Sequence, residues 1–413
     1  MANRECKIPV KDLQVGQSIR LPLAWKEHPF MFNRFRIKDE GQIQLIRKLG
    51  LNHVFLQLAE GESTPQFVEP ATPAAPTAID TETLRCQQAE RDAVAKESQT
   101  YRRLLKKCEQ AYGKSLENVR TSFSRLPTTP DQAYADGSAV VDEILRQFDE
   151  AGSETVLQLV AANQEGTMQF HAMNVSVVAM VLGRALGLDG PQLRELGLAA
   201  LVHDVGKLRV PSAILNKRTP LNKAEQNFLY QHPKLALEML KGTPFATKGI
   251  FAMVSGHHEY LDGSGYPQKL SGKAISPMTQ ILTIANEYDN LVNGTVKSLP
   301  PYQALAFMFK NRAKQLNPTF LQTLVKTLGV YPPGTLLRLE NGQVSKVISS
   351  DPAQPLFPTL MLYDAEIPKK EAPMVSLDML GLKIDGVLKV SELTEAQCHY
   401  LDVSPALAYY VRR

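Results

Sequence analysis

Five of the eight histidines lie between residues 171 and 258, where an even spread over 413 residues would place fewer than two. They are His171, His203, His232, His257 and His258. Imidazole nitrogens are common ligands of first-row transition metals, and none of the four cysteines lies in this window to favour a structural zinc site. The clustering therefore predicts a metal centre.

Asp204 directly follows His203 in an apolar stretch, Leu196–Leu208, that we expect to be one helix. A carboxylate beside an imidazole can bridge two cations. Adjacent helical side chains diverge by about 100°, so both reach one cation only near a helix end or a cleft. Lys207 lies on the same face and could neutralise charge on a phosphate oxygen. Taken alone, the pair is equally compatible with a buried ion pair.

His257 and His258 form a second pair, which we expect at a helix end, where the two rings can point to different metals. The loop that follows is rich in glycine and supplies backbone N–H groups and an aromatic hydroxyl. Its sequence is Asp262-Gly263-Ser264-Gly265-Tyr266-Pro267. Alone, His171 and His232 would be interpreted as core or capping histidines. Beside the other residues, we interpret both as ligands.

Helices must position most of these residues. From about residue 139 to 330, apolar residues recur at helical spacing through Val156–Ala162, Val175–Leu186, Leu193–Leu201 and Phe228–Leu240. Strand signals are almost absent in this zone, which predicts an all-helical catalytic domain. The fold class expected for the whole chain is mainly α, with a small α+β N-terminal domain and a short β-containing C-terminal appendage.

The rest of the chain divides by composition into four zones. Residues 1–60 alternate strand-like runs (Ser18–Leu21, His53–Leu56) with a helical stretch, Glu40–Leu49. Residues 61–82 are rich in Pro and Ala and are predicted to be a linker. A charged connecting helical region follows over 83–138. In the appendage, 331–413, Asn341-Gly342 predicts a hairpin with a two-residue turn.

Charge and hydropathy exclude several classes of protein. The net charge of +4 is mild and no long basic run occurs, so we expect no nucleic-acid polymer as partner. The most apolar tract, Val175–Leu188, contains Arg184 and is too short to cross a bilayer, so we expect no membrane span. The cysteines form no CxxC pair and the first residues lack a signal-peptide pattern. We expect a cytoplasmic protein.

The order of these residues resembles the HD-GYP phosphodiesterases, a branch of the HD superfamily. The resemblance covers roughly residues 140–345 and rests on HDxGK at 203–207 and HHExxDGxGYP at 257–267. It implies hydrolysis of cyclic di-GMP to pGpG, and onward to GMP, at a centre of iron or manganese. The N-terminal zone is similar to a small domain often found ahead of HD-GYP domains.

Carried over by position, the resemblance assigns a role to each candidate residue. The implied metal ligands are His171, His203, Asp204, His232, His257, His258 and Asn286. Asp204 and Lys207 are the implied catalytic residues, and Lys207, Tyr266 and Lys297 the implied substrate contacts. It also implies that the Gly-Tyr-Pro loop contacts diguanylate cyclase domains, and we count a homodimer among the expected assemblies.

Three departures from the family pattern qualify this assignment. Thr167 replaces the glutamate of trinuclear members, so we expect two divalent metal ions. Asn286 stands where the family has an aspartate ligand, and Asp289 is a candidate substitute. The basic stretch that usually follows is reduced to Lys297.

Three alternatives stay open at this point. The first is a degenerate HD-GYP protein that senses the nucleotide or docks cyclases without hydrolysis. The second is an HD-type di-iron oxygenase. The third is an HD phosphohydrolase for other nucleotides.

Overall fold

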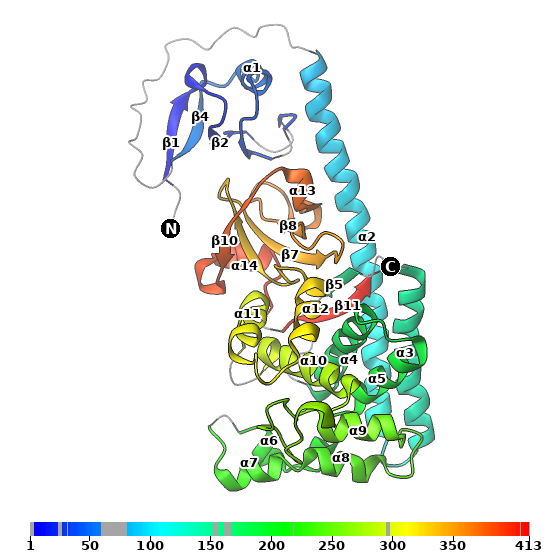
Figure 1. The fold of residues 1–413 in the computed structure, drawn as a ribbon. Helices are drawn as coiled ribbons and strands as arrows, with labels where there is room; N and C mark the ends of the chain where they lie inside the picture. Colours follow the sequence, from blue (N-terminus) through cyan, green and yellow to red (C-terminus); the bar gives the residue numbers. More distant parts are fainter. Residues whose placement is uncertain are drawn as a thin grey trace. The chain divides into compact units, whose positions relative to one another are not determined.

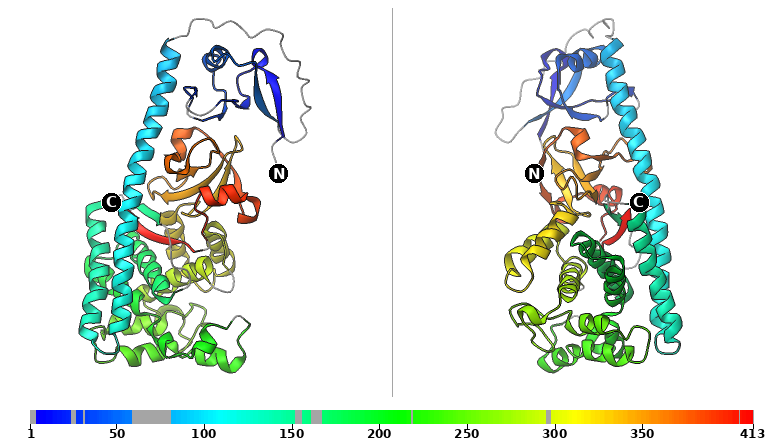
Figure 2. Two further views of the ribbon diagram at one scale, coloured as in Figure 1. Left: turned by 180° about the vertical axis from the view of Figure 1, so that it is seen from behind. Right: turned by 45° about the vertical axis from the view of Figure 1, so that its right-hand side comes forward.

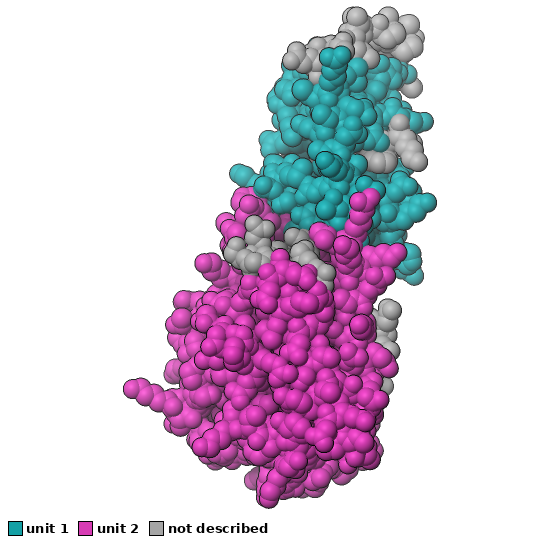
Figure 3. Space-filling view, turned by 90° about the vertical axis from the view of Figure 1, so that its right-hand side faces the viewer, with its two compact units in different colours: residues 1–102, 336–346, 359–401 teal, residues 103–335, 347–358, 402–413 magenta. Residues whose placement is uncertain are grey.

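The computed structural model describes residues 4–23, 27–30, 32–58, 81–151, 156–160, 167–217, 219–294, 298–404 and 406–412. The chain forms two compact units, coloured separately in Figure 3. Unit 1 contains residues 1–102, 336–346 and 359–401, and unit 2 contains 103–335, 347–358 and 402–413. Among the described residues, no helix is both long and apolar enough to cross a membrane. The predicted linker, 61–82, falls almost wholly outside the described residues.

The N-terminal part of unit 1 is an antiparallel sheet with one helix. The strands are β1 (Arg4–Pro9), β2 (Ser18–Arg20), β3 (Arg34–Arg36) and β4 (His53–Leu58), in the order β1-β4-β2-β3, with the 3-10 turn η1 (Val10–Asp12) and helix α1 (Glu40–Lys48). Asp39 begins α1 by accepting a hydrogen bond from the Gln42 backbone N–H. Ile19, Ile46 and Val54 are fully buried in its core. The expected α+β character is confirmed.

The remainder of unit 1 combines the start of a long helix with short strands. These elements are α2 (Thr81–Arg125, up to residue 102), β6 (Leu336–Leu339), the first residues of β7 (Val344–Ser350), β8 (Thr359–Leu362), η5 (Lys369–Glu371), β9 (Met374–Ser376), α13 (Leu377–Leu380), β10 (Ile384–Leu388), η6 (Val390–Glu392) and α14 (Glu395–Tyr400).

The predicted β6–β7 hairpin is present, but its loop is one residue longer than expected. Leu339 N–H bonds to the Gln343 carbonyl, so residues 340–342 form the loop. Gly342 N–H bonds back to the Leu339 carbonyl, and Gly342 has a φ of 79°. A turn followed by one left-handed glycine is the usual three-residue hairpin, which the Asn-Gly pair alone does not distinguish from a two-residue turn.

Unit 2 is helical, and its core surrounds one apolar helix, α4. Its helices are the rest of α2, α3 (Pro130–Ala151), α4 (Met168–Ala185), α5 (Gly190–Val202), η3 (Val205–Arg209), α6 (Ser212–Leu215), α7 (Lys223–Leu229), α8 (His232–Leu240), α9 (Lys248–Gly256), η4 (Gly272–Ala274), α10 (Pro277–Asn293), α11 (Pro301–Asn311) and α12 (Pro318–Leu328). Helix α4 packs against α5, α10 and α12, and the end of α2 runs beside α3 (Figures 1 and 2). The expected mainly α fold is confirmed.

The expectation of a helix at Val156–Ala162 was wrong. Residues Val156–Val160 form strand β5, which pairs antiparallel with the C-terminal strand β11 (Ala408–Arg412). Leu157 and Gln158 also pair with Ser350 and Ser349 at the end of β7. Five residues are too few to separate the two periodicities, and the deciding partners come from distant sequence.

The expected helix Leu196–Leu208 is interrupted at the His-Asp pair. Helix α5 ends at Val202, His203 caps it, and the chain continues as the 3-10 turn η3 from Val205. Gly206 permits this path, because a Cβ there would lie 1.9 Å from the His232 carbonyl oxygen. The close approach of η3 to α8 sets His203 and Asp204 at a helix end, where two adjacent side chains can face one site.

Candidate metal centre

The structure brings six of the seven predicted ligands together in two groups that share one carboxylate. Within each group the donor atoms lie within 4.8 Å of one another. One group is His171, His203 and Asp204, and the other is Asp204, His232, His257 and His258. Because Asp204 belongs to both, its two oxygens are placed to join two cation sites.

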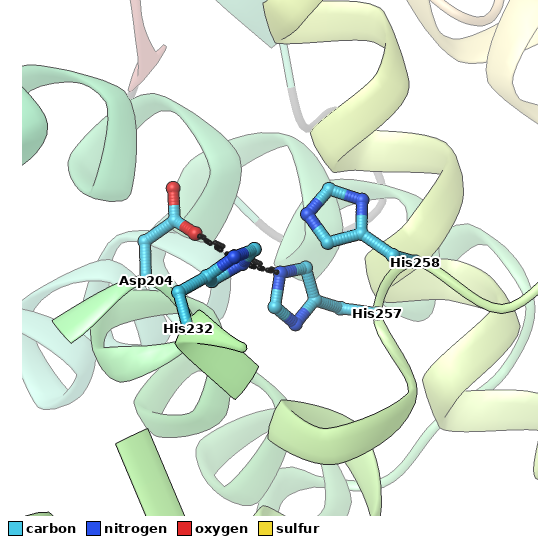
Figure 4. A group of neighbouring side chains, drawn as sticks. All are labelled: Asp204, His232, His257 and His258. Carbon is cyan, nitrogen blue, oxygen red and sulfur yellow. Dashed lines mark hydrogen bonds and ion pairs between the residues drawn. The ribbon is translucent and has the colours of Figure 1, made fainter. Parts of the chain in front are cut away.

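Helix ends supply most of these side chains. His203 ends α5, His232 begins α8, and His257 ends α9 with His258 directly after it. His171 comes from the first turn of α4. Figure 4 shows Asp204 and the rings of the second group facing a common region. Helix ends allow adjacent side chains to converge, whereas helix interiors separate them.

Backbone acceptors fix the tautomer of three rings. In each, Nδ1 lies within hydrogen-bond distance of the carbonyl oxygen three residues earlier. The pairs are His203 with Ala200 at 2.6 Å, His232 with Leu229 at 2.8 Å, and His257 with Val254 at 2.8 Å. A carbonyl oxygen can only accept, so Nδ1 carries the proton. In the neutral ring, Nε2 is then a free lone pair, which is the form that binds a metal.

These lone pairs face each other at short range. His232 Nε2 lies 3.2 Å from His257 Nε2, and His203 Nε2 lies 3.3 Å from His171 Nε2. Asp204 Oδ1 lies 3.2 Å from His232 Nε2, and this buried oxygen has no hydrogen-bond partner among the described residues. Facing lone pairs repel unless a cation lies between them. The residues present therefore fit a metal-binding site.

Burial keeps the ligands in their metal-binding protonation state. It lowers the pKa of His257 to about 3 and lowers the pKa of His203 and His258 in the same direction. Burial alone would raise the pKa of Asp204, but Lys207, with Nζ 2.5 Å from Oδ2, and His203 hold it well below its usual value. At neutral pH, His203, His257 and His258 are therefore neutral imidazoles and Asp204 is a carboxylate.

Asp289 lies behind His171 and holds that ring. Its Oδ2 accepts a hydrogen bond from His171 Nδ1 at 2.6 Å. Its Oδ1 accepts from Asn174 Nδ2 at 3.1 Å and from Asn293 Nδ2 at 2.8 Å. A carboxylate on the far nitrogen of a ligand histidine orients the ring and raises its basicity. The structure thus places Asp289 in a supporting position, where the sequence suggested a substitute ligand.

The C-terminal segment completes this support. The Leu407 carbonyl accepts from Asn174 Nδ2 at 3.0 Å and from Asn293 Nδ2 at 2.9 Å. Leu407 N–H donates to Asn293 Oδ1 at 2.8 Å. Sequence reasoning missed these two asparagines. The available signal was Asn174 itself, a polar residue one turn after His171 in a largely apolar helix.

Three predicted features remain outside the group. Asn286 is buried, and its Oδ1 accepts a hydrogen bond from Asn290 Nδ2 at 2.9 Å. Thr167 is the N-cap of α4 and accepts from the Phe170 backbone N–H. Lys297 lies outside the described residues. The roles of Asn286 and Lys297 stay predictions.

The aromatic ring of the Gly-Tyr-Pro loop packs on the second group of clustered residues, which contains His258. The Tyr266 ring stacks on His258, with centroids 4.5 Å apart, and on Tyr230, with centroids 3.9 Å apart. Buried Glu259 accepts hydrogen bonds from the backbone N–H groups of Gln268 and Leu270. These contacts fix the loop beside the second group of ligands.

Comparison with known proteins agrees with this geometry. Residues 154–320 match the family described as HD domain. Residues 5–136 match a family described as a domain of unknown function, DUF3391. The matched HD region contains all six clustered residues.

Curated relatives extend the match. The chain is 27% identical to the cyclic di-GMP phosphodiesterase PA4108 of Pseudomonas aeruginosa, over 90% of this chain and 88% of that protein. It is 30% identical to the cyclic di-GMP phosphodiesterase response regulator RpfG of Xanthomonas campestris, over 44% and 50% of the two chains. It is 36% identical to 3'3'-cGAMP-specific phosphodiesterase 3 of Vibrio cholerae, over 39% and 35%.

A solved structure, Bd1817, an HDG"Y"P protein from Bdellovibrio bacteriovorus, aligns with a TM-score of 0.44 and 16% identity, covering 78% of this chain and 98% of that one. The relatives and the HD match confirm the identification made from the motifs. Residues 154–320 of this chain thus match an HD domain, residues 5–136 match DUF3391, and the chain is similar to bacterial cyclic dinucleotide phosphodiesterases.

Proposed function

We propose that this chain is a metal-dependent phosphodiesterase that opens cyclic di-GMP to pGpG in the bacterial cytoplasm, and continues to GMP. One observation carries the proposal. Four histidine Nε2 lone pairs converge in two pairs on the two oxygens of Asp204. The Pseudomonas aeruginosa relative, which this chain matches over 88% of that protein's length, is named a cyclic di-GMP phosphodiesterase.

The six clustered residues would hold two divalent ions, for which we propose iron or manganese because the donors are nitrogen and oxygen. Bound there, such ions would lower the pKa of a water molecule from 15.7 to about 7 and so supply a nucleophile at neutral pH. Asn286 remains a proposed additional ligand. The Thr167 side chain caps helix α4, so it is not free to serve as a ligand for a third ion, and we propose two ions.

Residues of this chain would do the remaining work. Lys207 is partly exposed, at 25%, and its ammonium group lies on Asp204 Oδ2. It therefore presents positive charge beside the bridging carboxylate, where a scissile phosphate would gather negative charge. Tyr266, fixed by its two ring stacks, would form one wall of the substrate site. Lys297 is the further phosphate contact that we propose.

Two of the implied partnerships are also proposals. The Gly-Tyr-Pro loop is the surface we propose for diguanylate cyclase domains, and a homodimer is the assembly we propose. Co-purification with a cyclase domain, compared between the unchanged chain and Tyr266→Ala, tests the first. Light scattering of the full chain tests the second.

The central test joins metal content to turnover in one sample. The protein is purified without oxygen, its metals are counted, and cyclic di-GMP is followed by chromatography with added Mn²⁺ or Fe²⁺. We expect about two metals per chain and conversion to pGpG, with both lost in His203→Ala. His399→Ala, which changes an exposed histidine, is the matched control.

Failure has a defined meaning. If every metal leaves cyclic di-GMP bound but intact, the chain is a sensor and Asn286 is the first residue to examine. The name of the Vibrio cholerae relative favours one competing substrate, 3'3'-cGAMP. Faster turnover of that nucleotide in the same assay would replace cyclic di-GMP as the substrate. Oxygen uptake would instead indicate oxygenase chemistry.

A further inference from the structure

Unit 1 contains a cavity that the proposed hydrolysis does not use. Its volume is about 360 Å³, within the range of small-molecule pockets. The inner lining, which we call the amide cavity, includes Phe30, Phe32, Phe35, Gln42, Gln87 and Asn341. These residues come from the β2–β3 connection, β3, α1, α2 and the β6–β7 loop, so segments distant in sequence converge on it.

Two amides in this lining have unused hydrogen-bonding capacity. Gln87 is 8% exposed, and its side chain has no hydrogen-bond partner in the described part of the chain. Gln42 is 3% exposed, and its Oε1 accepts from the Lys38 backbone N–H while its Nε2 donates to no described group. Neither amide is among the described side chains whose unpartnered polar atoms are sealed from solvent, so the free atoms of Gln87 and Gln42 face space where a ligand or water can complete them.

Aromatic rings form the second feature of the amide cavity. Phe30 and Phe35 stack with centroids 4.5 Å apart and planes 23° apart. Phe32 is 4% exposed, yet it is not one of the side chains that form the hydrophobic core of the N-terminal sheet. Aromatic faces beside amide edges suit a planar ring whose rim carries hydrogen-bond donors and acceptors.

The charged residues of the lining determine the expected charge of the ligand. Two cations, Arg36 and Lys38, and two carboxylates, Glu90 and Glu340, line the amide cavity, and all four are exposed. The charges of the two pairs cancel. The electrostatics therefore give no net attraction for a polyanion such as a cyclic dinucleotide, and we expect uncharged contacts to determine the affinity.

We propose that the amide cavity binds a purine nucleoside through its base. A side-chain amide can donate to and accept from the edge of a purine at once, and Gln87 and Gln42 provide such groups inside an aromatic wall. The proposal assigns a ligand site to unit 1. It goes beyond the hydrolysis proposed for unit 2 and does not depend on it.

Calorimetric titration of the full chain with adenosine, guanosine, uridine and cytidine is the test. We expect the purine nucleosides to bind and the pyrimidine nucleosides to bind more weakly. The affinities of AMP and GMP should differ from those of adenosine and guanosine by less than about threefold, because the exposed charges of the lining cancel. Absence of binding by both purine nucleosides, or preference for pyrimidines, overturns the proposal.

Variants locate the site. Gln87→Leu should weaken purine binding by about tenfold or more, because it leaves the base edge unpaired. Gln88→Leu, on the exposed side of the same helix, is the matched control and should change affinity by less than about twofold. Leu382→Trp, which fills the cavity from its half-buried wall, should abolish binding while circular dichroism and thermal unfolding stay unchanged. Equal affinities in Gln87→Leu and Gln88→Leu overturn the proposal.

His203→Ala separates this site from the metal centre. We expect that variant to lose hydrolysis and keep purine binding. Loss of nucleoside binding in His203→Ala would place the ligand at the metal centre and overturn the proposal, whatever the outcome for hydrolysis.

Discussion

The metal centre of unit 2 and the amide cavity of unit 1 bury polar side chains in opposite ways. At the candidate metal centre, Nδ1 of His171, His203, His232 and His257 each has an acceptor, which leaves the Nε2 lone pairs facing inward. In the amide cavity, Gln87 has no partner at all among the described residues. The first arrangement is preorganised for a cation, and the second is open to a ligand that supplies the hydrogen bonds.

The largest effect that this comparison predicts comes from Asp204→Asn. The carboxamide offers one weak oxygen where two groups of ligands share a carboxylate. We expect the loss of at least one metal and a fall in hydrolysis of roughly a thousandfold, because charge and bridging disappear together. Metal analysis and the turnover of cyclic di-GMP measure it.

Asp378→Asn, at an exposed position in unit 1, is the control for charge removal. If Asp204→Asn retains two metals and most of its activity, Asp204 is a structural ion-pair partner of Lys207, and the metal-centre interpretation fails.

Asp289→Asn should give a smaller loss, because it changes the support of a ligand and leaves the ligand itself. The asparagine can accept one hydrogen bond from His171 but no longer stabilises the ring through a charge. We expect metal affinity to fall by about 10- to 100-fold. A competition titration against a chelator measures it.

Glu287→Gln, on the same helix but paired with Arg312, serves as the matched control. An Asp289→Asn protein with unchanged affinity would show that His171 is held by packing alone.

The convergence of the candidate ligand residues could be predicted because the expected chemistry depends on side-chain type and spacing. His203-Asp204 and His257-His258 are adjacent pairs, and adjacency is visible in a sequence. The supporting residues could not be found in this way. Asp289 is 118 residues from His171, and the Leu407 carbonyl, which ties Asn174 to Asn293, is a backbone group with no sequence signature. Contacts of that kind are set by the tertiary fold.

The same limit explains the errors in the fold. Val156–Val160 is a strand because β11 lies beside it, although its apolar spacing also suits a helix. The amide cavity was not predicted either, because its lining comes from five separate segments and no local pattern marks it. Local propensity decides an element only where distant partners agree with it.

The pH dependence of stability is the next expected effect. Burial holds the pKa of His257 at about 3, below its usual 6.5, and lowers the pKa of His203 and His258. The unfolded chain therefore binds more protons than the folded chain below about pH 6.5, and stability falls as the pH falls. We expect a loss of about 1.4 kcal/mol per pH unit for each such histidine in the metal-free protein.

Urea unfolding at a series of pH values between about 5 and 8, with a chelator present, measures this slope. His257→Asn should reduce it by the share of one histidine, whereas His399→Ala should not. A flat profile below pH 6.5 would mean that the metal-free rings are hydrated, contrary to their burial.

The smallest expected effect is a change in the free energy of unfolding at the amide cavity. It directly tests the difference between this cavity and the candidate metal centre. Gln87→Leu should change the free energy of unfolding by less than about 0.5 kcal/mol, because the amide has no hydrogen bond to lose. Asn174→Leu, a similar change near the metal centre, should destabilise the protein by about 1–3 kcal/mol, because it leaves the Asp289 carboxylate short of a donor. Urea unfolding of both variants without ligand gives the two numbers. Equal losses would mean that Gln87 already has a partner in solution, and the amide cavity would then be a packed interface without capacity for a ligand.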